Sequence, residues 1–273
     1  MYGQYKRLPG EHVGVLTGKG LEWGGYLIRP AATGFGAVYF LEGMLAAKKD
    51  KLAGKRCIIS GFGNVAWGTA LKLAELGAKL VAISGPDGYI IDEEGITTPE
   101  KIAYMDELNA TRNNVVEPFA KKFKSAKFVK GKKVWEVPCE IAMTCAIQNE
   151  LNGDDAKKLI DNKVKYVVEV SNMGCTADAV AALQKKKVSF APGKAANAGG
   201  VATSGLEMSQ NAMHLSWTRE EVDEKLHGIM NSIQTNCVKY GTEKNGYINY
   251  VKGANIAGFI KVADAMIAQG IAY

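Results

Sequence analysis

The chain has 273 residues, of which 47% are hydrophobic and 23% are charged, with a formal net charge of +6. This composition is ordinary for a soluble globular protein, and the length suits one large domain or two small ones. No apolar run reaches the roughly eighteen residues of a membrane span, and the first residues lack the apolar core of a signal peptide, so we expect neither a membrane partner nor secretion.

Short apolar strands alternate with amphipathic helices along the middle of the chain, which predicts an α/β domain with a mostly parallel sheet. The predicted strands are residues 56–60, 79–84, 139–143, 165–170 and 188–191, and the helices between them are 64–77, 154–160 and 176–186. The helix at 64–77 has its apolar stripe on Val65, Leu71, Leu73 and Leu76 and stops at Gly77. A tight turn follows the second strand at 84–88.

Beyond about residue 195 the pattern predicts helices alone. They cover residues 197–213, 218–241 and 253–270. The sheet therefore belongs to the middle of the chain, and the C-terminal third is expected to be all-helical.

The positive charge is concentrated at residues 121–133, which carry seven lysines and no acid. A nucleic-acid patch would explain this run, but no arginine or stacking tyrosine is interleaved with the lysines. A solvated helix end and hairpin is the favoured interpretation. We expect no nucleic-acid partner.

The cysteine usage points to a reducing compartment. The five cysteines are odd in number, widely spread and free of any Cys-x-x-Cys spacing. They are expected to be reduced thiols of a cytoplasmic protein, and neither a disulfide framework nor a metal site is predicted. The cysteines are Cys57, Cys139, Cys145, Cys175 and Cys237.

The stretch Cys57–Gly68 reads CIISGFGNVAWG and joins the first strand to the first helix. A lone Gly-x-Gly pattern is weak evidence, but here strand, glycines, helix and second strand follow within about thirty residues. Gly61 allows the sharp turn, Gly63 allows a pyrophosphate close to the backbone, and Ala66 is small enough for helix–strand packing. The pattern predicts a Rossmann-like dinucleotide site, with a purely structural turn as the alternative.

One expected feature of such a site is missing. A carboxylate at the end of the second strand normally holds the adenosine ribose of NAD, but that strand ends in Ser84-Gly85-Pro86 and the first acid is Asp87. A 2′-phosphate would not be repelled, so the pattern leaves NADP possible beside NAD.

Several longer motifs carry a family resemblance. They are LTGKGLEWGGYLIRPAATGFGAVYF at 16–40, GFGNVAWG, SGPDGY, KAANAGGVATSGLEMSQNA at 194–212, LSWTREEVDEKLHGIM at 215–230 and the closing GANIAGFIKVADAMIAQGI. With them, nearly the whole chain resembles the small hexameric bacterial type of glutamate dehydrogenase, and SGLEMSQN resembles the glutamate enzymes within a superfamily that also oxidises leucine, phenylalanine and valine.

The resemblance implies roles for matched positions. Thr33, Asn172 and Asn197 correspond to residues at the nicotinamide end of the cofactor. Ser204 corresponds to the serine that binds the distal carboxylate of glutamate, and Val201 lines that pocket. The remaining implied cofactor positions, along the pyrophosphate and after the second strand, are Gly61, Phe62, Gly63, Asn64, Val65 and Ser84.

Each assignment has a simpler alternative. Thr33 and Ser204 could be helix caps, Asn64 could be a turn residue, and asparagines beside glycines, such as Asn172 and Asn197, are common in loops. NAD is the favoured cofactor, on the expectation that Phe62 and Pro86 crowd the ribose end and leave no arginine for a 2′-phosphate.

Some positions depart from the family pattern. Ala31 stands where the family usually has glutamate, and Gly174-Cys175 replaces a proline-containing turn. Thr144 and Ile147 change the usual PCATQNEL to TCAIQNEL. These changes affect the expected loop geometry around the nicotinamide.

The family pattern also places a substrate domain, with the general-base lysine, ahead of the residues matched here. We therefore expect no catalytic residue in this chain, and inactivity of the chain alone. The expected division is a remnant of the substrate domain and linker at 1–23, a dinucleotide-binding domain at 24–248, and a final helix at 249–273 that in the family packs on the substrate domain.

The implied reaction is oxidative deamination of L-glutamate to 2-oxoglutarate and ammonia with NAD(P), by a homo-oligomer that is a hexamer in the family. Two alternatives remain open: a non-catalytic dinucleotide-binding module, and a dehydrogenase of leucine, phenylalanine or valine. The hydroxyl of Ser204 suits a distal carboxylate better than an apolar side chain.

Overall fold

The computed structural model describes residues 2–8, 14–25 and 28–270. Residues 1 and 9–13 of the expected N-terminal remnant, and 271–273 of the expected final helix, lie outside the described residues. The division into three segments stays a prediction.

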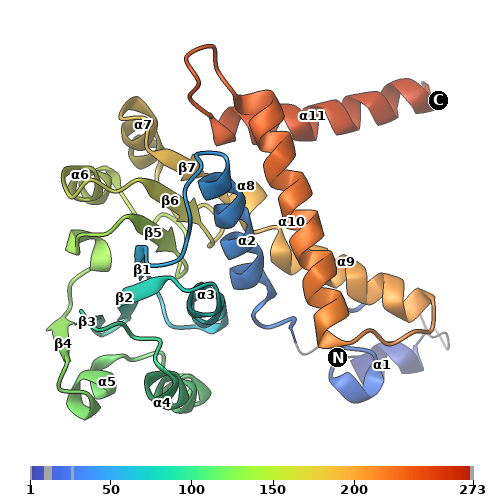
Figure 1. The fold of residues 1–273 in the computed structure, drawn as a ribbon. Coiled ribbons are helices and arrows are strands. Elements are labelled where there is room, and N and C mark those ends of the chain that lie inside the picture. The colour runs from blue at the N-terminus through green and yellow to red at the C-terminus, as the bar shows by residue number, and fades with distance from the viewer. Residues whose placement is uncertain (1, 9–13, 26–27, 271–273) are drawn as a thin grey trace.

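Strands and helices alternate through the middle of the chain (Figure 1). The strands are β1 (Arg56–Ile59), β2 (Lys79–Gly85), β3 (Gly88–Asp92), β4 (Ala126–Lys130), β5 (Ile141–Thr144), β6 (Tyr166–Glu169) and β7 (Ser189–Ala191). The helices are α1 (Tyr2–Arg7), η1 (Leu21–Trp23), α2 (Ala32–Ala46), α3 (Asn64–Glu75), α4 (Pro99–Ala110), α5 (Glu117–Lys122), η2 (Val134–Glu136), α6 (Gly153–Asp161), α7 (Ala177–Lys185), α8 (Gly193–Ala196), α9 (Gly199–Ala212), α10 (Arg219–Gly241) and α11 (Tyr250–Gln269).

The strands form one seven-stranded sheet in the order β4-β3-β2-β1-β5-β6-β7. β1, β2, β5, β6 and β7 pair in parallel, while β3 runs antiparallel to both of its neighbours. The chain moves from β1 to β2 on one side and later returns to place β5 on the other side of β1. The expected mostly parallel sheet is confirmed, with a switch in strand order between β1 and β5.

Both faces of the sheet are covered by helices, because successive strand residues point to opposite sides. In β1, Cys57 and Ile59 belong to the apolar cluster shared with α2, α3 and α10, whereas Ile58 belongs to the cluster shared with α6 and α7. In β5 and β6, Met143 and Val168 face the first cluster. The near-continuous apolar strands of the sequence follow from this double burial.

Two strands were missed by the sequence pattern. β3 and β4 form the antiparallel side of the sheet, and β4 lies inside the lysine run at 121–133. The expected helix end is present as α5, but the expected hairpin is wrong because β4 pairs with β3, far earlier in the chain. Lys127 and Lys130 flank Phe128 and Val129 there, which obscures the strand pattern.

The predicted apolar stripe of α3 is partly wrong. Leu73 is fully buried, but Val65, Leu71 and Leu76 are only partly buried. The buried face consists instead of small and mixed residues, among them Ala66 and Ala70. The cause is close packing on α2, where a Cβ added at Gly34 would lie 2.3 Å from the backbone nitrogen of Thr69.

The C-terminal third is helical, as expected. α10 packs along α2 and α11, and α11 projects away from the rest of the fold (Figure 1). Phe259, Val262 and Met266 on α11 are 73%, 60% and 66% exposed. No helix among the described residues is long and apolar enough to cross a bilayer.

Candidate functional site

The glycine turn joins β1 to α3 at the centre of the sheet. Gly61 adopts φ +78°, and a Cβ there would lie 2.9 Å from the Cβ of Ala146, so both conformation and space call for glycine. The backbone N–H of Gly61 donates to Ser84 Oγ at 3.1 Å, which ties the turn to the end of β2.

Gly63 differs from Gly61, because its surroundings are open. A Cβ at Gly63 would have no heavy atom within 4 Å, and the backbone has an ordinary φ of −79°. Gly63 is the N-cap of α3 and no side chain caps this helix end. Free N–H groups and the positive end of the helix dipole therefore border open space, the arrangement that binds a phosphate.

That open space is a cleft of about 630 Å³, here named the glycine-turn cleft. It is lined by Ser60, Gly61, Phe62, Gly63, Asn64, Val65, Ser84, Gly85, Pro86, Gly88, Asn114, Gly131, Lys132, Lys133, Val134, Trp135, Cys145, Ala146, Ile147 and Glu150. Every residue expected along the pyrophosphate, together with Ser84, lines this cleft.

A second cleft of about 630 Å³ continues from the first and is named here the Ser204 cleft. It is lined by Arg29, Thr33, Val65, Cys145, Ala146, Ile147, Gln148, Val170, Ser171, Asn172, Asn197, Gly200, Val201 and Ser204. The residues expected at the nicotinamide and substrate ends are thus brought together. The two clefts share the segment 145–147 after β5, so they meet at the switch between β1 and β5, where open α/β sheets bind ligands.

The helix-cap alternatives for two residues are wrong. The N-cap of α2 is Ala31, so Thr33 lies inside the first turn, and Ser204 lies well inside α9, whose N-cap is Ala198. A Cβ added at Gly200 would lie 2.5 Å from Thr33 Oγ1, so α2 and α9 approach closely at the cleft wall.

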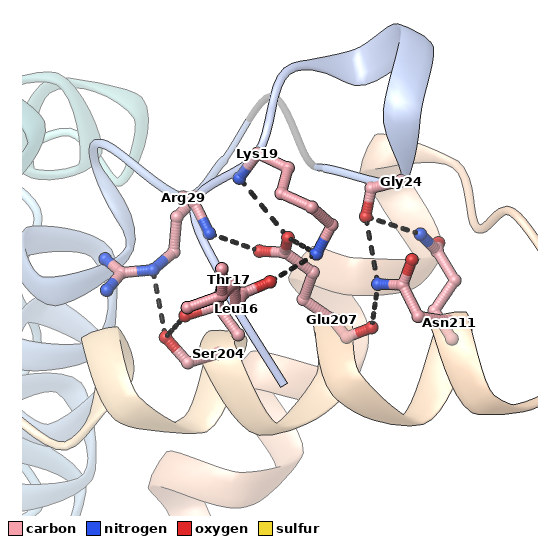
Figure 2. A network of polar contacts seen from close by, with 10 residues as sticks. Leu16, Thr17, Lys19, Gly24, Arg29, Ser204, Glu207 and Asn211 are labelled. Atoms are coloured by element: carbon pink, nitrogen blue, oxygen red, sulfur yellow. Dashed lines mark hydrogen bonds and ion pairs between the residues drawn. The ribbon is translucent and has the colours of Figure 1, made fainter. Parts of the chain in front are cut away.

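Two residues that sequence reasoning left without a role contact Ser204. Thr17 Oγ1 donates to Ser204 Oγ at 3.1 Å, and Arg29 Nε donates to the same oxygen at 3.1 Å (Figure 2). Among the described residues no carboxylate forms an ion pair with Arg29, so its positive charge is available at the cleft. Both residues fall within the motif at 16–40, but nothing local in that motif indicates contact with α9.

The adenosine end differs from expectation. Phe62 is 1% exposed and its ring packs edge-on against Trp67, so the ring does not crowd a ribose. The carboxylate of Asp87 accepts from the N–H groups of Val116 and Glu117 and does not line the cleft.

Two lysines of the basic run, Lys132 and Lys133, are exposed, as the solvated-surface interpretation expects, and they also border the cleft. Lys132 Nζ lies 3.5 Å from Glu136, and Lys133 Nζ lies 2.7 Å from Asp155. No arginine lines the glycine-turn cleft among the described residues, so its cationic side chains are these two ion-paired lysines.

Glu150 is the one carboxylate among the residues that line the glycine-turn cleft. Burial raises the pKa of Glu150, and hydrogen bonds from Ser60 and the N–H of Ala146 oppose that shift. Burial also raises the pKa of Cys145 well above that of a free thiol, so it is a neutral wall residue. No group of His, Cys, Asp and Glu side chains suited to a metal ion occurs among the described residues.

Two departures from the family pattern fit one another. A Cβ at Gly174 would lie 2.1 Å from Thr144 Oγ1, so the glycine makes room for the threonine hydroxyl. Ile147, another departure, is 68% exposed and lines both clefts. Of these residues only Ile147 borders the junction of the two clefts, since Thr144 and Gly174 line neither of them.

The family model described as Glutamate/Leucine/Phenylalanine/Valine dehydrogenase matches residues 24–270. The chain belongs to this family. It is 64% identical over 271 residues to an NAD-specific glutamate dehydrogenase of Bacteroides fragilis, covering 99% of this chain and 61% of that relative. It is 55% identical to an NAD(P)-specific glutamate dehydrogenase of Xylanibacter ruminicola, again over 99% of this chain and 61% of the relative.

Solved structures that resemble this chain point to the same family. A glutamate dehydrogenase structure with 52% sequence identity superposes with a TM-score of 0.95, covering 100% of this chain and 61% of that one. The chain thus spans about three fifths of the length of the relatives that it matches. The dinucleotide-binding fold expected from the glycine turn is that of the family.

Proposed function

We propose that this chain is the cofactor-binding part of an NAD(P)-dependent glutamate dehydrogenase. The reaction converts L-glutamate, NAD(P)⁺ and water into 2-oxoglutarate, ammonium, NAD(P)H and a proton. The single observation that carries the proposal is the continuity of the two clefts, which joins an uncapped helix end at Gly63 to the arginine-bound hydroxyl of Ser204.

The residues present fit a dinucleotide. At Gly63 the open cradle would be filled by any Cβ, and the N–H groups at the start of α3 would hold the pyrophosphate. At the far end the paired amides of Asn172 and Asn197, with Thr33, would hold the nicotinamide and its ribose. When bound, the cofactor accepts a hydride from the substrate Cα.

The chemistry around Ser204 favours glutamate over a leucine, phenylalanine or valine substrate. Arg29 and the Ser204 hydroxyl offer a positive charge and hydrogen bonding to a distal carboxylate, with Val201 beside them. An apolar substrate side chain would leave Arg29 and the Ser204 hydroxyl unpaired in a closed site. A pocket built to hydrogen-bond a substrate therefore rejects an analogue that lacks the bonding group.

No Lys, His, Asp or Glu is present among the described residues that line the Ser204 cleft. A general base at the amino group would have to come from elsewhere, so we expect the 273-residue chain alone to bind dinucleotide without producing NADH from glutamate. We place the protein in the cytoplasm, since all five cysteines are buried and unpaired. We also propose that the protein assembles as a homo-hexamer, and that the exposed apolar residues of α11 pack on the substrate domain.

The proposal is tested by calorimetric titration of the chain with NADH, with GTP as a nucleotide control. We expect saturable binding of NADH and none of GTP. Equal binding of both nucleotides, or no binding of NADH, would contradict the proposal.

A further inference from the structure

Three residues on one face of α9 hold the loop at 16–24. Ser204, Glu207 and Asn211 are spaced three and four residues apart, so they project from the same side of the helix. In chain order they contact Thr17, the Gly18–Lys19 segment and the carbonyl of Gly24 (Figure 2).

Glu207 is the centre of this contact. Its carboxylate is 0% exposed and accepts hydrogen bonds from Gly18 N at 2.8 Å, Lys19 N at 3.3 Å and Lys19 Nζ at 2.6 Å. The Lys19 side chain is 3% exposed, and its ammonium also donates to the carbonyl of Leu16 at 2.5 Å. The loop therefore wraps a buried carboxylate that neither cleft contacts.

Stability alone does not account for this ion pair. Replacing a buried ion pair by apolar residues of similar volume is often neutral or stabilising, because desolvation of the charges offsets their attraction. The ion pair instead fixes the position of the loop. The backbone N–H groups of Gly18 and Lys19 and the Lys19 ammonium all donate to Glu207, which holds the backbone next to Thr17 in place.

The fixed backbone determines how Ser204 can bind a ligand. Ser204 Oγ has two acceptor lone pairs and one O–H. Arg29 Nε can only donate to that oxygen, and the Thr17 hydroxyl lies 3.1 Å from it. With Thr17 as the second donor, both lone pairs of Ser204 Oγ are used and its own hydrogen is left for a ligand. A carboxylate, which can only accept, fits such a hydroxyl.

We propose that Glu207 and Lys19 are positioning residues that make Ser204 a hydrogen-bond donor toward the cleft and so select a dicarboxylate. This inference rests on the proposed function of Ser204. Neither residue touches the ligand; both act through Thr17.

The test uses the NADH-loaded 273-residue chain and two probes of the same shape. 2-Oxoglutarate carries the distal carboxylate, and 5-methyl-2-oxohexanoate carries an isopropyl group in its place. Affinities for both are measured by NMR chemical-shift titration, with NADH affinity and the melting temperature measured in parallel.

The variants separate position from general destabilisation. Lys19→Met/Glu207→Leu removes the Lys19–Glu207 ion pair. Thr17→Val removes only the hydroxyl that this ion pair positions beside Ser204. The matched control is Lys101→Met/Asp92→Leu, because that pair is also 2.6 Å long, with side chains 7% and 0% exposed, and lies outside both clefts.

We expect the wild type to prefer 2-oxoglutarate by at least about tenfold (about 1.4 kcal/mol). That preference should largely disappear in Lys19→Met/Glu207→Leu and in Thr17→Val, while NADH affinity stays within about twofold. The control pair should keep the preference.

Three results would overturn the inference: no preference in the wild type, a retained preference in Thr17→Val, or an equal loss in the control pair. Absence of NADH binding in the wild type would instead contradict the proposed function, so the two failures are distinguishable.

Discussion

Asn197 Nδ2 donates to Asn172 Oδ1 at 2.7 Å, which joins the loop after β6 to the end of α8 across the wall of the Ser204 cleft. The pair leaves the Asn172 amide nitrogen and the Asn197 amide oxygen for a ligand. The Asn172 nitrogen can donate and the Asn197 oxygen can accept. These two groups match the carboxamide of a nicotinamide, whose oxygen accepts and whose NH₂ group donates.

Replacing Asn172 by alanine should therefore weaken NADH binding while leaving ADP binding unchanged. Loss of one such contact costs about 1 kcal/mol, or about fivefold in affinity. ADP serves as the internal control because it lacks the nicotinamide half. Equal weakening for ADP and NADH, measured by calorimetry, would show that Asn172 acts on the fold and not on the nicotinamide.

Lys132 should govern how well the cleft accepts a 2′-phosphate. The carboxylate of Asp87 is bound by backbone N–H groups outside the glycine-turn cleft and Lys132 lines that cleft, so NADPH should bind within about tenfold of NADH. Lys132→Glu should weaken NADPH binding by about tenfold more than NADH binding, since a like charge replaces an attraction.

The matched control is Lys130→Glu, the same charge change in the same run but outside the cleft. Fluorescence titrations with both nucleotides give the comparison. If Lys132→Glu weakened NADH and NADPH equally, Lys132 would have no part in cofactor choice.

Glu150 should make stability depend on pH. Because burial raises its pKa in the folded chain, the folded state holds this proton at pH values where the unfolded state has lost it. The free energy of unfolding should thus be highest below the ordinary glutamate pKa and fall as pH rises through the raised pKa. Glu150→Gln should remove this fall.

Urea unfolding of the wild type and Glu150→Gln measures this fall in the free energy of unfolding. The pH series runs from below the ordinary glutamate pKa to above the raised pKa of Glu150. The two curves should converge at low pH and separate at high pH, with the variant more stable. Curves that stay parallel over the whole range would mean that Glu150 ionises alike in both states.

The sequence predicted the parallel sheet and the glycine turn because local patterns determine them. Buried strands, a positive φ at Gly61 and the stop at Gly77 all leave local traces. The antiparallel strands were not predicted, since lysines interrupt β4 and its partner β3 lies more than thirty residues earlier. The roles of Thr17 and Arg29 were not predicted from the sequence. Their shared partner Ser204 lies 187 residues after Thr17 and 175 residues after Arg29.

Phe62 gives the clearest failure of pattern reasoning. Its position in the turn indicated a side chain against the ribose, yet the ring packs on Trp67 within the core. Backbone direction at a turn decides which way a side chain points, and the one-dimensional pattern does not contain that direction.

The most direct test of the dinucleotide cleft is the NADH affinity of Gly63→Val beside Gly228→Val. Both glycines are open, with no atom within 4 Å of an added Cβ, but Gly228 lies on α10 outside both clefts. Gly63→Val should weaken NADH binding by at least about tenfold (about 1.4 kcal/mol) with little change in melting temperature, because the side chain fills the phosphate cradle. Gly228→Val should bind NADH as the wild type does. Equal NADH affinities for Gly63→Val and the wild type would contradict a pyrophosphate site at this turn.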